Sequence, residues 1–220
     1  MKHILKDNED IQARIDSWVE RAKGKGSAGW EEFSREAGED GIYPATKAAL
    51  IEEQGAICCY CEREIATSPC HIEHFQGRAA HPQRMFDYGN MHASCNGFPN
   101  KAVNCCGDKR AQHRKPRNPD IPVSPLEEDC ETRFRYTGSG AIEPESDDDH
   151  AAAETISILG LGSRKLCAMR KDVLRELVNC WKGMAADEFA TYVQEKLKRD
   201  ADGHFAEFFT AIRQYGDELR

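Results

Sequence analysis

The cysteines and histidines whose types and spacing could bind a metal or move a proton cluster between residues 58 and 109. Cysteines form two groups there, Cys58-Cys59-Tyr60-Cys61 and Cys105-Cys106, with Cys95 between them. Zinc in structural sites takes four ligands in tetrahedral geometry, and a Cys-x-x-Cys spacing supplies two of them. The sequence therefore predicts a structural zinc site, completed by Cys95 and one of the two adjacent cysteines.

The doubled cysteine leaves the fourth ligand open between Cys105 and Cys106. We favour Cys106, because Gly107 follows it and a lysine lies three positions beyond it. Cys59 is then the expected non-ligand of the first group, and the alternative is that some of these thiols are simply buried. The predicted zinc ligands are Cys58, Cys61, Cys95 and Cys106.

Between the two groups of cysteines lies the segment His71-Ile72-Glu73-His74. Hydrolysis of a phosphodiester needs a general base for the attacking water and a divalent cation that stabilises charge on the phosphate. The imidazole of His74 suits the first role, because its ordinary pKa lies near neutral pH. In an extended segment Glu73 points to the opposite face, where it can hold the cation. Without the flanking cysteines, a pair of histidines would more often be structural, and this is the alternative interpretation.

The elements that must position these side chains suggest an α+β fold, in which a small zinc-stapled module is embedded in α-helical N- and C-terminal flanks. We expect an N-terminal helical segment over residues 1–55 and the module over 56–117. An extended or hairpin connector is expected over 118–150, and a C-terminal helical segment over 151–220. Apolar residues recur at helical spacing in both flanks, whereas the module alternates short apolar runs with Gly, Pro and Asn.

Individual elements follow from the same patterns. Alternating charged and apolar residues around a Gly-Ser-Gly turn predict a hairpin over residues 131–142. Ser163 is the predicted N-cap of a long helix. Asp187 is the expected cap of the next helix. The predicted helices cover residues 9–23, 30–36, 44–55, 151–159, 163–184, 187–198 and 204–215.

The formal charge of −8 argues against a chain that coats nucleic acid non-specifically. Local basic residues beside the module can still contact phosphates. A solvated helix end is the alternative. No apolar run approaches the length of a membrane span, and the first twelve residues lack the apolar core of a signal peptide, so we expect a cytoplasmic protein without membrane contact. The predicted phosphate contacts are Lys101, Lys109, Arg110, Arg114 and Lys115.

The order of these motifs resembles an HNH endonuclease of the ββα-metal type. The resemblance implies that Glu73 binds a catalytic Mg²⁺ or Mn²⁺, that His74 is the general base, and that Asn90 holds the base loop through backbone hydrogen bonds. In that family a His or Asn at the start of the α-element is a second cation ligand, but here Gly107 follows Cys106. Asp108 is the first candidate for that role, ahead of Asn96 and His113.

A wider set of motifs, with CCYCE, HIEHF, SCNG, CGDK, VSPLEEDCETRFRYTGSG and TISILGLG among them, is similar to the nuclease subunit of Septu anti-phage systems. Related proteins are encoded with some retrons. The likeness spans about residues 45–170. It implies a partner, a PtuA-like ABC-type ATPase, and a nucleic acid substrate, with DNA favoured and RNA or tRNA open. The competing hypothesis is a non-catalytic zinc-binding adaptor for nucleic acid or protein.

Overall fold

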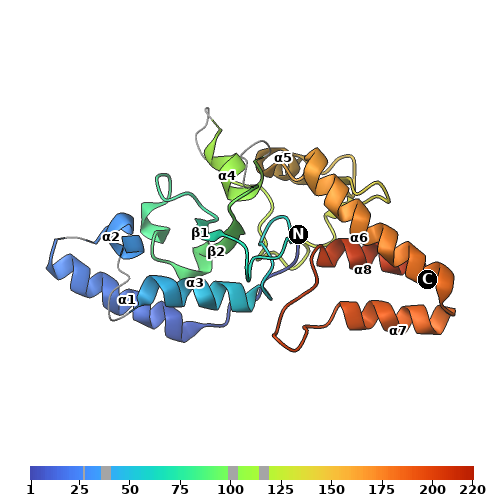
Figure 1. Ribbon diagram of the computed structural model, residues 1–220. Helices are drawn as coiled ribbons and strands as arrows, with labels where there is room; N and C mark the ends of the chain where they lie inside the picture. The colour runs from blue at the N-terminus through green and yellow to red at the C-terminus, as the bar shows by residue number, and fades with distance from the viewer. Residues whose placement is uncertain (27, 36–40, 99–103, 114–118) are drawn as a thin grey trace.

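The computed structural model describes residues 1–26, 28–35, 41–98, 104–113 and 119–220, and within them the chain has the expected mixed α+β architecture. Two small antiparallel sheets, β1–β2 and β3–β4, lie between two groups of helices. Figure 1 shows α1 and α2 at one end of the molecule and α6, α7 and α8 at the other, with β1, β2 and α3 in between.

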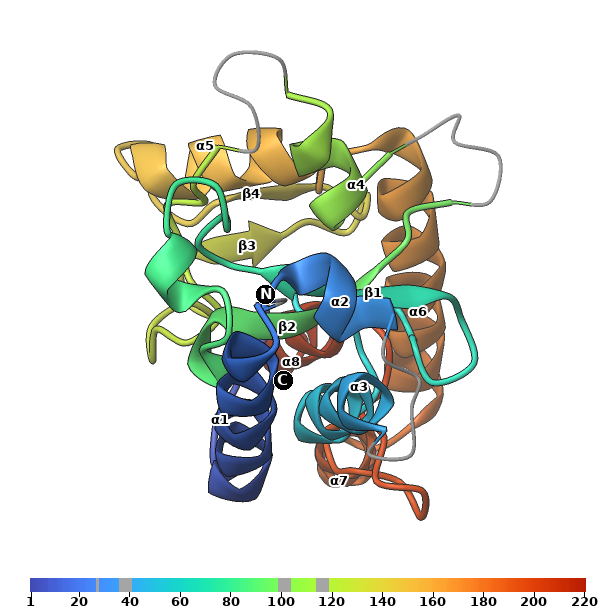
Figure 2. The same cartoon turned by 90° about the vertical axis from the view of Figure 1, so that its left-hand side faces the viewer.

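The N-terminal helices form where the sequence places apolar side chains on one face. Helix α1 (Glu9–Gly24) buries Ile11, Ile15 and Trp18, and the side chain of Asn8 caps it by accepting a hydrogen bond from the Ile11 N–H at 3.2 Å. The short helix α2 (Trp30–Arg35) buries Phe33, whose ring meets Trp18 edge-on at 5.0 Å. The Trp18 contact fixes α2 to α1, and Trp30 of α2 packs edge-on against His74 of β1. In Figure 2 α2 lies in front of β1 and β2.

Helix α3 (Ile42–Glu53) delivers the chain into the cysteine-rich segment through a glycine C-terminus. Gly55 has φ +60°, and the Ala56 N–H returns to the Ile51 carbonyl, so the helix ends in a Schellman-type turn. Next to it the buried Gln54 side chain pairs with β2 (Met91–Cys95) as a strand would. It accepts from the Ala93 N–H at 2.7 Å and donates to the Ala93 carbonyl at 2.8 Å. This pairing ties α3 to the central sheet.

The central sheet pairs β1 (Cys70–His74) with β2, and Glu73 faces His92 across the pair. Along β1 the side chains alternate, so that Ile72 and His74 are buried while His71 and Glu73 are half-buried on the other face. Helix α4 (Cys106–Ala111) packs against β2. Along the chain β1, β2 and α4 follow one another in that order, with two short 3₁₀ turns between the strands.

The C-terminal half begins with the predicted hairpin, formed by β3 (Phe134–Tyr136) and β4 (Ile142–Pro144). Asp149 caps α5 (His150–Leu159), and Ser163 caps α6 (Arg164–Gly183) as predicted. The guanidinium of the buried Arg170 donates to the carbonyls of Gly140 and Leu161, so one side chain joins the hairpin turn to the turn between the two helices.

Two details of the last helices differ from the sequence prediction. Asp187 is not a cap, because α7 (Ala186–Lys196) begins before it and the Glu188 carboxylate accepts from the Ala185 N–H instead. Helix α8 (Phe209–Glu218) starts five residues later than predicted. The residues before it bond to the cysteine-rich segment: the Phe205 N–H reaches the Gly55 carbonyl and the Phe208 N–H the Glu62 carbonyl.

The main hydrophobic core draws residues from all parts of the described chain, including Ile15, Leu50, Met91, Phe134 and Leu166. A smaller cluster around Phe189 and Val193 lies among α6, α7 and α8. None of the helices in the described part of the chain has the length and apolarity to cross a membrane.

Candidate metal centre and active site

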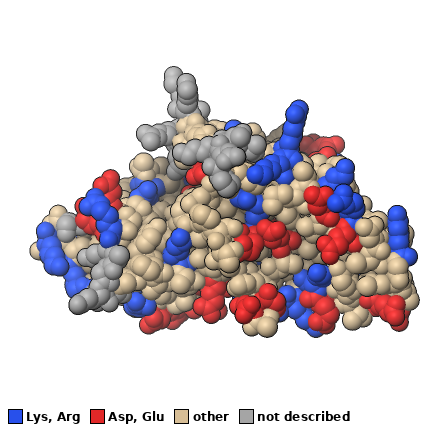
Figure 3. All heavy atoms as spheres, in the orientation of Figure 1, with Lys and Arg blue, Asp and Glu red and all other residues tan. Residues whose placement is uncertain are grey.

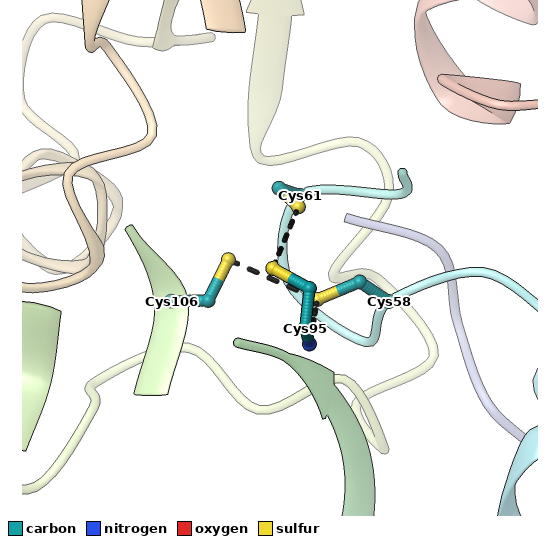
Figure 4. Close-up of side chains that lie close together, drawn as sticks. All are labelled: Cys58, Cys61, Cys95 and Cys106. Carbon is teal, nitrogen blue, oxygen red and sulfur yellow. Dashed lines mark hydrogen bonds between the residues drawn. The ribbon is translucent and has the colours of Figure 1, made fainter. Parts of the chain in front are cut away.

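Four buried cysteines converge on one point, as Figure 4 shows. Their Sγ atoms all lie within 4.8 Å of one another, with 3.7 Å between Cys61 and Cys95 and 3.8 Å between Cys58 and Cys106. Tetrahedral zinc with Zn–S bonds of about 2.3 Å places its sulfurs about 3.8 Å apart. The cluster therefore fits a metal such as zinc, and its donors are the four that the sequence analysis selected.

Turn hydrogen bonds and two left-handed backbone conformations place these thiols close together. The Cys58 N–H bonds to the Arg63 carbonyl and the Glu62 N–H to the Cys58 carbonyl, which closes the turn around Cys58 and Cys61. Glu62 has φ +60° and Cys106 has φ +59°, a left-handed conformation that non-glycine residues rarely adopt. Such strain persists where the surroundings hold it, and at Cys106 the side chain thereby reaches the cluster from the start of α4.

Cys59 and Cys105 are not members of the cluster of four, although the thiol of Cys105 lies close enough to interact with those of Cys61 and Cys95. Among the described residues, the compact group of metal-binding side chains contains Cys106 and not its neighbour Cys105. Cys59 is buried, and this burial raises the pKa of its thiol well above the usual range. Because it lies outside the group of four and belongs to the main hydrophobic core, Cys59 behaves as a small core residue.

His74, the predicted general base, ends β1 with one ring nitrogen engaged. Its Nε2 lies 2.9 Å from the Met85 carbonyl oxygen, which can only accept, so Nε2 carries the proton and Nδ1 carries the lone pair. Burial lowers the pKa of His74 to about 4, and the imidazole is neutral near pH 7. Trp30 of α2 packs edge-on against it, with 4.4 Å between ring centroids. The arrangement leaves a neutral imidazole able to accept a proton at Nδ1.

Glu73, the predicted cation ligand, is held by a buried arginine. Arg110 of α4 is fully buried, and its Nη1 donates to Glu73 Oε1 at 2.8 Å. The same guanidinium donates to the carbonyls of His74, Phe75 and Pro119. Burial by itself would raise the pKa of Glu73, but His71 and Arg110 together lower it, so the carboxylate is charged.

The enclosure of Arg110 does not fit the predicted phosphate contact. A guanidinium whose exposed fraction is zero, and which bonds to four groups of its own chain, cannot also meet a substrate at the surface. We therefore correct that assignment. Arg110 is a structural residue that orients β1 and the carboxylate of Glu73.

Asn90 makes the backbone contacts that the resemblance predicts for it. Its side-chain oxygen accepts from the Gln76 N–H at 2.7 Å, and its amide nitrogen donates to the carbonyls of Gln76 and Arg84 at 3.0 and 3.1 Å. Its backbone carbonyl also accepts from the Phe75 N–H. Asn90 thus joins both ends of the loop that follows His74.

The candidates for the second cation ligand lie in different places. Asp108 reaches towards Gly97, and within the described residues it does not belong to a compact metal-binding group with Glu73. Asn96 Oδ1 lies 2.6 Å from His71 Nδ1, while His113 follows the end of α4. Among the described residues, the imidazole in contact with the Glu73 carboxylate is that of His71, whose Nε2 lies 3.4 Å from Glu73 Oε2.

Of the remaining predicted phosphate contacts, Lys101, Arg114 and Lys115 lie outside the described residues. The side chain of Lys109 packs beside Gly160 of the α5–α6 turn. Sequence reasoning did not single out Arg78, whose guanidinium lies 4.9 Å from the Trp30 ring centroid and lowers the pKa of His74 through its charge. On the face drawn in Figure 3, basic side chains are interspersed with acidic ones.

The fold and the site together define a small α+β protein with a buried cluster of four cysteines that fits a metal, and with a carboxylate–imidazole pair at the end of β1. No family model matches the chain. A curated protein of Vibrio cholerae serotype O1 biovar El Tor, named "Retron Vc95 putative HNH endonuclease", is 27% identical over 145 residues, which are 63% of this chain and 67% of that protein. The similarity supports a relationship to the HNH endonuclease family and suggests a nuclease.

Proposed function

We propose that this protein is a metal-dependent HNH endonuclease that hydrolyses phosphodiester bonds of nucleic acid. The observation that carries the proposal is the state of His74, a neutral imidazole whose Nε2–H is fixed on the Met85 carbonyl and whose Nδ1 keeps its lone pair. Glu73 precedes it on β1, charged and on the opposite face. A base and a cation ligand in consecutive positions of one strand suit attack on a phosphate lying over the strand end.

In the proposed reaction His74 Nδ1 takes a proton from water as the oxygen attacks phosphorus. The bond between phosphorus and the leaving oxygen breaks, and that oxygen acquires a proton from solvent. A divalent cation, Mg²⁺ or Mn²⁺, would neutralise charge on the phosphate and the leaving oxygen. Glu73 holds that cation, while Asn90 keeps the base loop closed so that the ring of His74 stays in one orientation.

The four cysteines are proposed to hold a structural zinc that takes no part in the reaction. Four thiolates fill all tetrahedral positions, and a closed site of that kind has no open position for water or substrate. The sequence offered Asp108 for a second ligand of the catalytic cation, whereas the described contacts leave it beside Gly97.

The biological setting is proposed from resemblance. The motifs resemble a Septu nuclease subunit, and the curated relative carries the name of a retron-associated nuclease. We infer an effector of anti-phage defence that acts with a PtuA-like ABC-type ATPase, located in the cytoplasm, with DNA favoured as substrate over RNA or tRNA. Lys101, Lys109, Arg114 and Lys115 remain the proposed phosphate contacts.

The decisive experiment compares His74→Ala with a matched histidine elsewhere. The zinc-loaded protein, alone and co-expressed with its ATPase partner, is assayed on DNA and tRNA with Mg²⁺ or Mn²⁺. We expect His74→Ala to lose cleavage by at least about a hundredfold, as removal of a general base does, with zinc content and circular dichroism unchanged. His150→Ala, at the exposed start of α5, should cleave at the parental rate. Parental cleavage by His74→Ala would refute the assignment.

The competing function is a non-catalytic zinc-binding adaptor. One observation favours it: His74 is buried beneath Trp30, with an exposed fraction of 6%. An adaptor would contain one zinc and bind its partner, but it would cleave neither substrate under any metal or nucleotide condition. The same assay therefore separates the two functions.

A further inference from the structure

The start of α4 lacks a side chain at the point where the sequence led us to expect a cation ligand. That position is Gly107, and a methyl group added there would lie 2.7 Å from His71 Nε2 and 2.8 Å from Glu73 Oε2. Atoms at such distances would clash with any side chain at position 107. The space beside the helix start is thus already filled by one nitrogen and one oxygen donor, both from β1.

His71 and Glu73 reach this space because they alternate with buried residues along β1. Positions two apart on a strand share a face, and His71 Nε2 lies 3.4 Å from Glu73 Oε2. Neighbouring ligands of an octahedral ion with bonds of about 2.1 Å are about 3.0 Å apart. A small movement of either side chain would let both atoms bind one cation.

Each of the two donors is oriented by a second residue. Asn96 Oδ1 lies 2.6 Å from His71 Nδ1, which places an imidazole proton on Nδ1, so a cation that displaces any proton between Nε2 and Glu73 Oε2 would meet the Nε2 lone pair. Arg110 engages Oε1 of Glu73, so Oε2 remains for the space beside Gly107. Ligands held from behind in this way are typical of metal sites rather than of solvated surface side chains.

We propose that His71 Nε2 and Glu73 Oε2 together bind the catalytic cation, and that His71 takes the place of the ligand missing at Gly107. The proposal rests on the function proposed above for Glu73. A nitrogen ligand favours a first-row transition ion, so the site selects Mn²⁺ over Mg²⁺, which prefers oxygen ligands. Because Arg110 offsets the charge of Glu73, the site binds weakly alone, and phosphate oxygens of the substrate complete it.

Mn²⁺ binding can be measured directly by electron paramagnetic resonance. The zinc-loaded full chain carries His74→Ala, so that a DNA duplex can be present without being cleaved. Adding His71→Ala should weaken Mn²⁺ binding at least tenfold, as loss of a metal-site residue does. It should also abolish the nitrogen modulation that a bound imidazole gives in the spin-echo signal. Zinc content and circular dichroism monitor the fold, and the side chain of His71 is 31% exposed, which favours tolerance of the change.

Two control variants, Asp108→Asn and His113→Ala, test the residues that the sequence offered for the same role. Each should bind Mn²⁺ within twofold of the background protein. Unchanged binding in His71→Ala, absence of the nitrogen modulation, or a loss in Asp108→Asn as large as in His71→Ala would each overturn the proposal. If Mn²⁺ binds through His71 but the parent protein never cleaves, the nuclease function fails while this site stands. If cleavage depends on His74 but not on His71, the nuclease function stands while this cation site fails.

Discussion

Replacing Arg110 with methionine tests whether the guanidinium is structural, as its burial indicates, or a contact for substrate. Methionine keeps an unbranched apolar stem of similar reach but removes every N–H. In the parent protein those N–H groups bond to Glu73 Oε1 at 2.8 Å and to the carbonyls of His74, Phe75 and Pro119 at 2.7–2.8 Å. The variant would therefore leave a half-enclosed carboxylate and three carbonyls without their donor.

The expected loss follows from those contacts. Removing one partner of a buried ion pair costs about 3–5 kcal/mol of unfolding free energy, because the remaining charge is left without compensation. Glu73 keeps a side-chain exposure of 13%, which lowers the figure by admitting some water, but the three unpaired carbonyls add to it. We expect a loss of about 4 kcal/mol, a large part of the 5–15 kcal/mol that is typical of domains.

A double-mutant cycle isolates the pair. Glu73→Gln removes the charge that Arg110→Met leaves unpaired, so the double variant should recover at least about 1 kcal/mol relative to the sum of the two single changes. Urea unfolding with zinc present, followed by tryptophan fluorescence, gives the free energies. If Arg110→Met does not fold, the double variant and Arg110→Lys still report the coupling. A stability within about 1 kcal/mol of the parent, together with weaker binding to nucleic acid, would show that our reading of Arg110 is wrong.

Two further predictions concern the cysteine cluster and the back of the sheet. Cys106→Ala should bind zinc at least about a hundredfold more weakly than the parent in a chelator competition, whereas Cys105→Ala should retain one equivalent, because Cys106 belongs to the group of four. Equal loss in both variants would mean that the doubled cysteine shares the site. His92→Leu should raise the free energy of unfolding by about 1 kcal/mol, since both ring nitrogens of this buried residue have no hydrogen-bond partner among the described residues. Thermal unfolding should then occur about 2–4 °C higher, and an unchanged or lower midpoint contradicts the argument.

The sequence predicted best where spacing alone determines geometry. The spacing of Cys58 and Cys61, together with the need for four zinc ligands, selected cysteines that the fold brings together. Apolar periodicity located α1 and α6, and Ser163 capped α6 where expected. The Cys-x-x-Cys pair and the helix cap depend on contacts within a few residues, which a single sequence records directly.

The errors arose where the position of a residue depends on what packs against it. For a charged residue this is the helix face on which it lies, and for a helix start it is a distant segment of the chain. Arg110 belongs to a basic run and was assigned to the surface, yet it lies four residues after Cys106 and so shares the inward face of α4. The start of α8 was misplaced because residues 204–208 pair with Gly55 and Glu62, more than 140 positions earlier. Such long-range pairings leave no local periodicity.

A signal for His71 was present and went unused. Period-two alternation places His71 and Glu73 on one face of β1, and the absence of a side chain at Gly107 opens the space that both donors fill. Sequence reasoning made His74 the general base and gave His71 no role. The pair that matters is the imidazole and carboxylate two positions apart.

The metal centre and the candidate active site are coupled through α4. A helix of six residues is not stable alone, and here three contacts fix it: Cys106 enters the thiol cluster, the Gly107 N–H lies 3.4 Å from Ser94 Oγ on β2, and Arg110 bonds to Glu73 on β1. With a metal on the four thiols, the start of α4 is fixed relative to both strands. Release of that metal would free α4, remove the wall beside His71 and Glu73, and withdraw Arg110 from the carboxylate it orients. A metal that takes no part in hydrolysis would thus still determine whether the catalytic residues meet.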